Sequence, residues 1–151
     1  MEKFNSVDEA LNFAISEEEK AAKLYAELAA KMEKPWMKKV FEDFAKEELG
    51  HKKRLLAIKE GGQMEPAEKK VMDLRIADYL ADAELKPDMD YQEALVFAMK
   101  AEKAAFKLYS DLAASTDDEE LRRTFLALAQ EEARHKLRFE VEYDDVILGE
   151  N

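Results

Sequence analysis

A chain of 151 residues fits a single domain spanning 1–151, since a folded domain of this size buries about 68–70% of its unfolded surface. Apolar residues make up 47% and charged residues 39%, with only 4 Gly and 3 Pro, which favours long amphipathic helices and an all-α fold. The net charge of −11 disfavours nucleic acid and anionic membranes as partners, and the lack of cysteine excludes disulfides, thiolate metal sites and iron–sulfur clusters.

The first half of the chain predicts two helices. Ser6-x-x-Glu9 is a capping-box pattern, and the apolar residues that follow at steps of three and four predict a helix from about 7 to 33. Pro35 is expected to open a second helix, which Gly61 and Gly62 should end. The N-terminal segment has no apolar core typical of a signal peptide, and no apolar run is long enough to span a bilayer, so a cytoplasmic protein is predicted.

The second half predicts two more helices, capped by Asp90-x-x-Glu93 and Thr116-x-x-Glu119. The connections within each half are short, so each half should form an antiparallel hairpin. The segment 61–89 between the halves is longer and should be a crossover with a helical stretch of its own after Pro66, whose apolar positions are Val71, Leu74, Ala77 and Ala81.

An internal repeat relates the two halves. Residues 7–60 and 91–144 align without gaps at a shift of 84, and 20 of the 54 aligned positions are identical. Each copy contains a Glu-x-x-His motif: Glu48 with His51, and Glu132 with His135. The sequence therefore predicts a duplicated helical hairpin.

Ionisable residues interrupt the apolar stripe of every predicted helix. They are Glu18, Glu48, His51, Glu102, Glu132 and His135. Four buried carboxylates would be costly without counter-charge, whereas two divalent cations balance them and two neutral imidazoles complete the coordination. The alternative is a solvated face with incidental symmetry, which does not explain why the only two histidines occupy equivalent positions. Carboxylate and imidazole ligands suit iron or manganese and, less selectively, zinc.

This pattern resembles the ferritin-like diiron-carboxylate superfamily, and most of all the rubrerythrin diiron domain, through Glu-x6-Tyr in the first and third helices and Glu-Glu-x-x-His in the second and fourth. The resemblance implies a ferritin-like four-helix bundle and two Fe ions, with Mn or Zn as other possible metals. It also implies that the six residues above are ligands and that Glu48 and Glu132 bridge the metals.

Two departures from the family pattern affect function. Full rubrerythrins carry a cysteine-ligated rubredoxin domain, so a chain without cysteine needs an external reductant such as a rubredoxin-type protein. Peroxide-reducing members have an additional glutamate near the third-helix ligand, where this chain has Ala105 one turn after Glu102. The resemblance further implies a role in oxidative stress and assembly as a homodimer or higher homo-oligomer.

For four residues near the predicted ligands, the sequence is consistent with more than one role. Tyr25 and Tyr109 lie two turns after Glu18 and Glu102, where a phenol could hydrogen-bond a ligand, handle a radical or simply pack in the core. Glu47 and Glu131 precede the ligand glutamates and could compete with them, although the stripe favours Glu48 and Glu132.

Three functions are consistent with the sequence. The first is a dinuclear non-haem metal oxidoreductase, of peroxidase or ferroxidase type, that reacts with peroxide or O2. The second is a ferritin-like protein that binds, oxidises or stores iron without a separate organic substrate. The third is a helical interaction module without metal.

Overall fold

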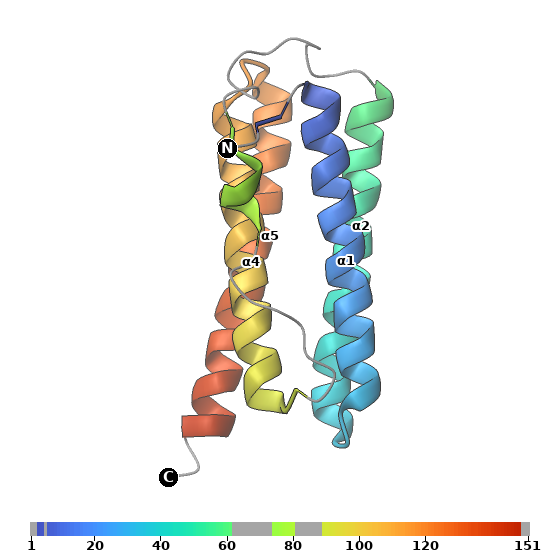
Figure 1. The fold of residues 1–151 in the computed structure, drawn as a ribbon, viewed down its shortest axis with the longest axis vertical. Coiled ribbons are helices and arrows are strands. Elements are labelled where there is room, and N and C mark those ends of the chain that lie inside the picture. Colours follow the sequence, from blue (N-terminus) through green and yellow to red (C-terminus); the bar gives the residue numbers. More distant parts are fainter. Residues whose placement is uncertain (1–2, 5, 62–73, 81–88, 149–151) are drawn as a thin grey trace.

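The structure is a computed structural model that describes residues 3–4, 6–61, 74–80 and 89–148. Its described residues form four long α-helices, with a short 3₁₀-helix before the third and a π-helical turn after the fourth (Figure 1). In chain order the elements are α1 Val7–Lys31, α2 Pro35–Gly61, η1 Ile76–Tyr79, α4 Tyr91–Ala114, α5 Glu119–Tyr143 and η2 Asp144–Leu148. The prediction of an all-α four-helix bundle is confirmed.

Two of the predicted helix caps are present. The Ser6 side chain accepts a hydrogen bond from the Glu9 backbone N–H at 3.1 Å. Asp90 and Glu93 form a reciprocal capping box at the start of α4. These side chains supply acceptors to N–H groups that have no partner within the helix, and they thereby define where each helix begins.

The predicted cap of the fourth helix is wrong. Asp118, not Thr116, is the N-cap of α5, and its carboxylate accepts from the Leu121 backbone N–H at 3.0 Å. The Thr116 hydroxyl instead accepts from the Asp118 N–H at 3.2 Å and so shapes the loop before the helix. A carboxylate is also the better cap electrostatically, because it opposes the positive end of the helix dipole.

The helices pair as α1 with α2 and α4 with α5, as the repeat predicts (Figure 1). Within each pair the backbones lie close along their length, whereas the backbones of the two pairs approach each other at few points. Longer side chains therefore fill the interior between the two hairpins, and that is where the Glu-x-x-His residues lie.

The apolar core is split into two clusters. One contains Leu11, Leu55, Leu112, Phe125 and Leu128 among others, and the second contains Leu28, Phe41, Leu95 and Phe139. Both clusters draw on all four helices, so each one ties the two hairpins together. The buried glutamates and histidines belong to neither cluster and form a separate polar layer.

The part of the crossover that the structure describes is tied to the bundle. The Phe4 N–H donates to the Leu74 carbonyl at 3.3 Å, and the Tyr79 hydroxyl donates to Asp111 on α4 at 2.8 Å. Most of the helical stretch predicted after Pro66 lies outside the described residues; Ala77, which belongs to it, is part of the 3₁₀-helix η1. None of the helices in the described part of the chain has the length and hydropathy needed to cross a membrane.

Candidate metal centre

The structure brings all six predicted ligand residues together in the polar layer. Each helix contributes from its buried stripe: Glu18 from α1, Glu48 and His51 from α2, Glu102 from α4, and Glu132 and His135 from α5. All six side chains are buried, with Glu132 fully inaccessible and His135 the most accessible at 5%. The i, i+3 spacing of each Glu-x-x-His places both of its side chains on the same face of the helix.

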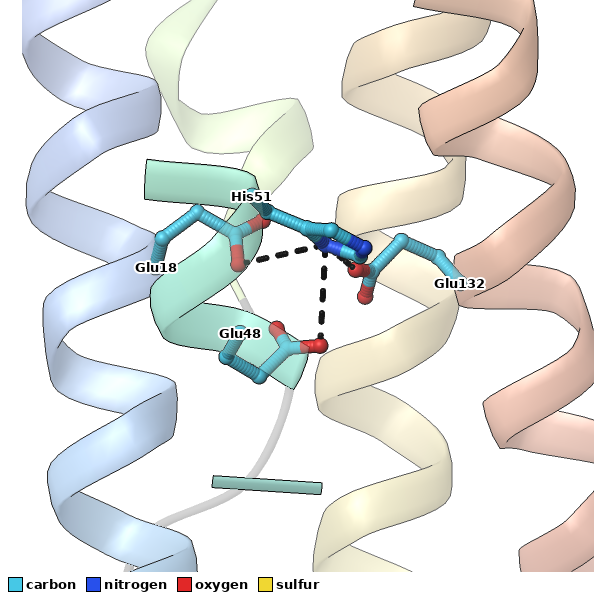
Figure 2. Close-up of side chains that lie close together, drawn as sticks. All are labelled: Glu18, Glu48, His51 and Glu132. Carbon is cyan, nitrogen blue, oxygen red and sulfur yellow. Dashed lines mark ion pairs between the residues drawn. The ribbon is translucent and has the colours of Figure 1, made fainter. Parts of the chain in front are cut away.

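The first group of these side chains surrounds the Nδ1 atom of His51. This nitrogen lies 2.6 Å from Glu132 Oε1, 3.5 Å from Glu18 Oε2 and 3.7 Å from Glu48 Oε1. Figure 2 shows the four side chains pointing toward one another, Glu48 and His51 from α2, Glu18 from α1 and Glu132 from α5. Three carboxylates and one imidazole nitrogen thus line one small volume.

The second group is centred on His135. Its Nδ1 lies 3.1 Å from Glu48 Oε1 and 3.6 Å from Glu102 Oε2. Glu132 belongs to this group too, so the two groups share Glu48 and Glu132, and within each group the four ligand atoms lie within 4.8 Å of one another. The imidazole rings of His51 and His135 are nearly parallel, with centroids 5.9 Å apart.

Many of the inward-facing atoms have no hydrogen-bond partner. They are Glu18 Oε2, Glu48 Oε1, His51 Nδ1, Glu102 Oε2, both oxygens of Glu132 and His135 Nδ1. Buried charged atoms without hydrogen bonds cost several kcal/mol, so a layer with this many is well suited to bind ions or protons. Lone pairs of carboxylates and imidazoles that converge on two adjacent points fit a pair of divalent cations.

The pKa values of the central carboxyl groups show that burial and neighbouring carboxylates disfavour their ionised forms. Burial raises the pKa of Glu48 well above its ordinary value, and the charges of Glu102 and Glu18 raise it further. Burial likewise raises the pKa of Glu132, with the charges of Glu102 and Glu48 adding to it. Burial acts to lower the pKa of His135, but the nearby Glu102 and Glu48 outweigh it and raise the pKa to about 10. Without cations, the layer therefore holds protons in their place.

Glu47 and Glu131 lie behind the histidines, away from the two groups. Glu131 Oε2 is 2.8 Å from His51 Nε2, and Glu47 makes the corresponding contact with His135 Nε2. A carboxylate on Nε2 favours the tautomer with its proton there, which leaves Nδ1 free to bind a metal. The geometry thus favours the flanking position over direct ligation for both residues.

The two tyrosines join the hairpins across the polar layer. The Tyr25 hydroxyl on α1 donates to Glu102 Oε1 on α4 at 2.5 Å, and the Tyr109 hydroxyl on α4 donates to Glu18 on α1. Burial, and then the neighbouring glutamate charges, raise the pKa of both phenols well above the ordinary value, so both stay protonated donors. Each tyrosine thereby orients one predicted ligand from the opposite hairpin.

Two features near the site were missed from the sequence. Arg54 donates to Glu131 at 2.6 Å and so belongs to the network around His51. Its partner lies 77 residues away on α5, although its place one turn after His51 was a usable signal. A cavity of about 250 Å³ between α1 and α4 also reaches the carboxylates, and residues such as Leu24, Phe97 and Leu108 line it.

Comparison with solved structures supports this fold. A Thermotoga maritima protein described as ferritin-like and diiron-carboxylate superposes with a TM-score of 0.74 at 20% sequence identity, covering 97% of this chain and 99% of its own. A hypothetical protein of Pyrococcus furiosus gives a TM-score of 0.70 at 26% identity, covering 93% of this chain and 89% of its own. The first likeness shows the fold alone.

Comparison with sequence families gives the identity of the domain. No curated protein matches the chain. The rubrerythrin family model, however, matches residues 9–143, which include all but the first two residues of the four helices and all six residues of the polar layer. The chain belongs to the rubrerythrin family and has a ferritin-like fold with a potential carboxylate and histidine metal site.

Proposed function

We propose that this protein is a dinuclear non-haem metal oxidoreductase, with iron as its metal, that reduces peroxide or O2 with electrons from a separate donor. The observation that carries the proposal is the pair of buried four-residue groups that share Glu48 and Glu132. Family membership supports it, because the rubrerythrin family model matches residues 9–143, which contain all six of these residues.

In this proposal each group holds one metal ion. Glu18 and His51 would bind the first metal, Glu102 and His135 the second, and Glu48 and Glu132 both. Four carboxylates would then balance two divalent cations, which removes the electrostatic cost of the layer. The neutral imidazoles would bind through Nδ1, with Glu131 and Glu47 holding the Nε2 protons.

A bound pair of reduced metals would supply the two electrons that, with two protons, convert one hydrogen peroxide into two waters. The residues of the chain contribute orientation and access. Tyr25 and Tyr109 hold Glu102 and Glu18 in place through their hydroxyl hydrogen bonds. The cavity between α1 and α4 offers a path by which a small oxidant would reach the carboxylates.

In this proposal the electrons come from a donor outside these 151 residues. The sequence contains no cysteine and therefore no rubredoxin-type iron site of its own. We propose a rubredoxin-type protein as the donor. We also propose a homodimer or higher homo-oligomer in the cytoplasm, on the strength of the family resemblance.

Anaerobic loading with Fe(II), followed by hydrogen peroxide, tests the function directly. The reduced protein should consume peroxide over repeated cycles when a reductant is supplied, and Glu48→Gln should abolish turnover because it removes a shared carboxylate. Glu42→Gln, an exposed change on the same helix, is the matched control and should keep full activity. Oxidation no faster than that of free Fe(II) would overturn the proposal.

Iron stoichiometry separates the enzyme from an iron store. An oxidoreductase should retain two metal ions per chain after desalting. Retention of many irons per chain, or assembly into a shell, would instead identify the iron-storage alternative. A protein that retains no metal and shows no change in melting temperature on metal addition would support a metal-free interaction module.

A further inference from the structure

The repeat gives both halves the same outer residues, but the structure uses them differently. At the shift of 84, Glu47 corresponds to Glu131 and Arg54 corresponds to Arg138. If the two halves were exactly symmetric, each histidine would have a glutamate in contact with its Nε2 atom, and an arginine would form an ion pair with that glutamate. Only one of the two copies has this arrangement.

The His51 side has the complete arrangement. Glu131 Oε2 accepts from Arg54 Nη2 at 2.6 Å and lies 2.8 Å from His51 Nε2, so one oxygen serves both groups. Arg134 approaches the other oxygen at 3.8 Å.

The His135 side lacks the arginine. Arg138 pairs with Glu142 at 3.6 Å, one turn further along α5, and Glu142 also accepts from the Tyr91 hydroxyl at 2.9 Å. Among the described residues, none of the ion pairs of Glu47 involves an arginine, and its side chain is 55% exposed against 27% for Glu131. Water therefore competes more strongly for Glu47 than for Glu131.

We infer that the two metal positions are unequal, and that Arg54 acts as a positioning residue that makes the His51 position fill first. Arg54 holds Glu131 in place, and Glu131 keeps the His51 ring in the tautomer and orientation that binds metal. The His51 side chain therefore loses less conformational entropy when a metal binds. Partners of this kind typically change metal affinity about 10-fold to 100-fold. The inference rests on the proposed metal centre but not on its redox activity.

The two histidines make the order of filling measurable. Because His51 and His135 are the only histidines, a chain with isotope-labelled histidine gives just two imidazole signal sets in nuclear magnetic resonance. The variant His135→Gln assigns them. Titration with zinc chloride, a diamagnetic probe, should shift the His51 signals to their bound positions during the first equivalent and the His135 signals mainly during the second.

Two arginine variants form the matched test. Arg54→Gln should weaken the first binding step by about 10-fold, so that both imidazoles shift together, whereas Arg138→Gln should leave the original order intact. Arg54→Lys keeps the charge but loses the planar fork, and it should restore the order only in part. Both arginines are largely exposed at the surface, so neither change should prevent folding.

Each other outcome is decisive. Simultaneous shifts in the unmodified protein, or His135 shifting first, would overturn the inference while leaving the metal centre standing. Loss of the order in Arg138→Gln to the same degree as in Arg54→Gln would also overturn it. If zinc shifted neither imidazole, the proposed metal centre itself would fail.

Discussion

The apolar clusters and the polar layer are equally buried but hold the bundle together in different ways. Phe41, Phe125 and Phe139 are completely inaccessible, and so is Glu132. Burial of the apolar side chains stabilises the fold, whereas the buried carboxylates lose their hydration and need other partners to compensate for that loss. The clusters can therefore stabilise the fold by themselves, while the layer between them depends on what it binds.

The packing around the polar layer also restricts the movement of its side chains. Large aromatic residues surround the layer: Phe44 lies with its ring centroid 4.5 Å from that of His135, and Tyr25 packs on Phe139 at 5.7 Å. Side chains in a close-packed core cannot turn away toward water without disrupting their neighbours. The layer is thus held in a charged arrangement that it would not adopt if it were free to relax.

The largest effect should come from the apolar clusters. Phe125→Ala removes a fully buried ring and should lower the free energy of unfolding by about 3–5 kcal/mol. The loss should be the same with and without metal, because Phe125 belongs to an apolar cluster. Chemical denaturation of both forms measures it, and a loss that depended strongly on metal would show that cluster and layer are coupled.

The polar layer should respond with opposite signs in the two forms. In metal-free protein Glu48→Gln removes a carboxyl group that the layer must otherwise keep protonated, and it should raise the free energy of unfolding. In protein with metal at about 100 times its dissociation constant, the same change should remove up to about 2.7 kcal/mol of binding stabilisation. Thermal melts with and without zinc test this, and destabilisation of equal size in both forms would contradict it.

A smaller effect should follow from the hydrogen bonds that join the hairpins. Tyr109→Phe removes the donor to Glu18 and should cost about 1.5–3 kcal/mol, the range for hydrogen bonds to charged groups. Tyr25→Phe is its counterpart in the repeat and should cost a similar amount by releasing Glu102. A cost near zero for both would show that these tyrosines serve only as packing.

A pH dependence of stability should appear only in the metal-free protein. The folded protein raises the pKa of His135 to about 10 and those of Glu48 and Glu132 above their ordinary values. Groups with raised pKa values stabilise the fold below their unfolded pKa and lose that contribution as the pH rises. Between pH 6.5 and about 10 the Tm should therefore fall, by about 2–4 °C for each kcal/mol lost.

Metal-loaded protein is the control for that measurement. Its ligands are already deprotonated, so its Tm should change little over the same range. A Tm of the metal-free protein that rose with pH would contradict the assigned directions.

Some features of the fold were predictable because they depend on local pattern. The spacing of apolar residues at steps of three and four predicted the four helices, and Ser6, Pro35 and Asp90 indicated where three of them begin. The start of α5 was not predictable in this way, because Thr116 and Asp118 are both good caps and the loop geometry chooses between them. The crossover showed the same limit, since the described part of it holds a 3₁₀-helix whose place depends on contacts with Phe4 and α4.

The sequence by itself determined that six ionisable side chains belong to buried stripes, because helical periodicity and an internal repeat are properties of the chain alone. Only the tertiary structure decided which of them share a group, since Glu48 meets His135, and Glu132 meets His51, only through the packing of the two hairpins. It also decided that Arg54 and Arg138, equivalent in sequence, have different partners. The partner of a long side chain at a helix surface depends on which residues of other helices lie nearby, and no local sequence pattern specifies this.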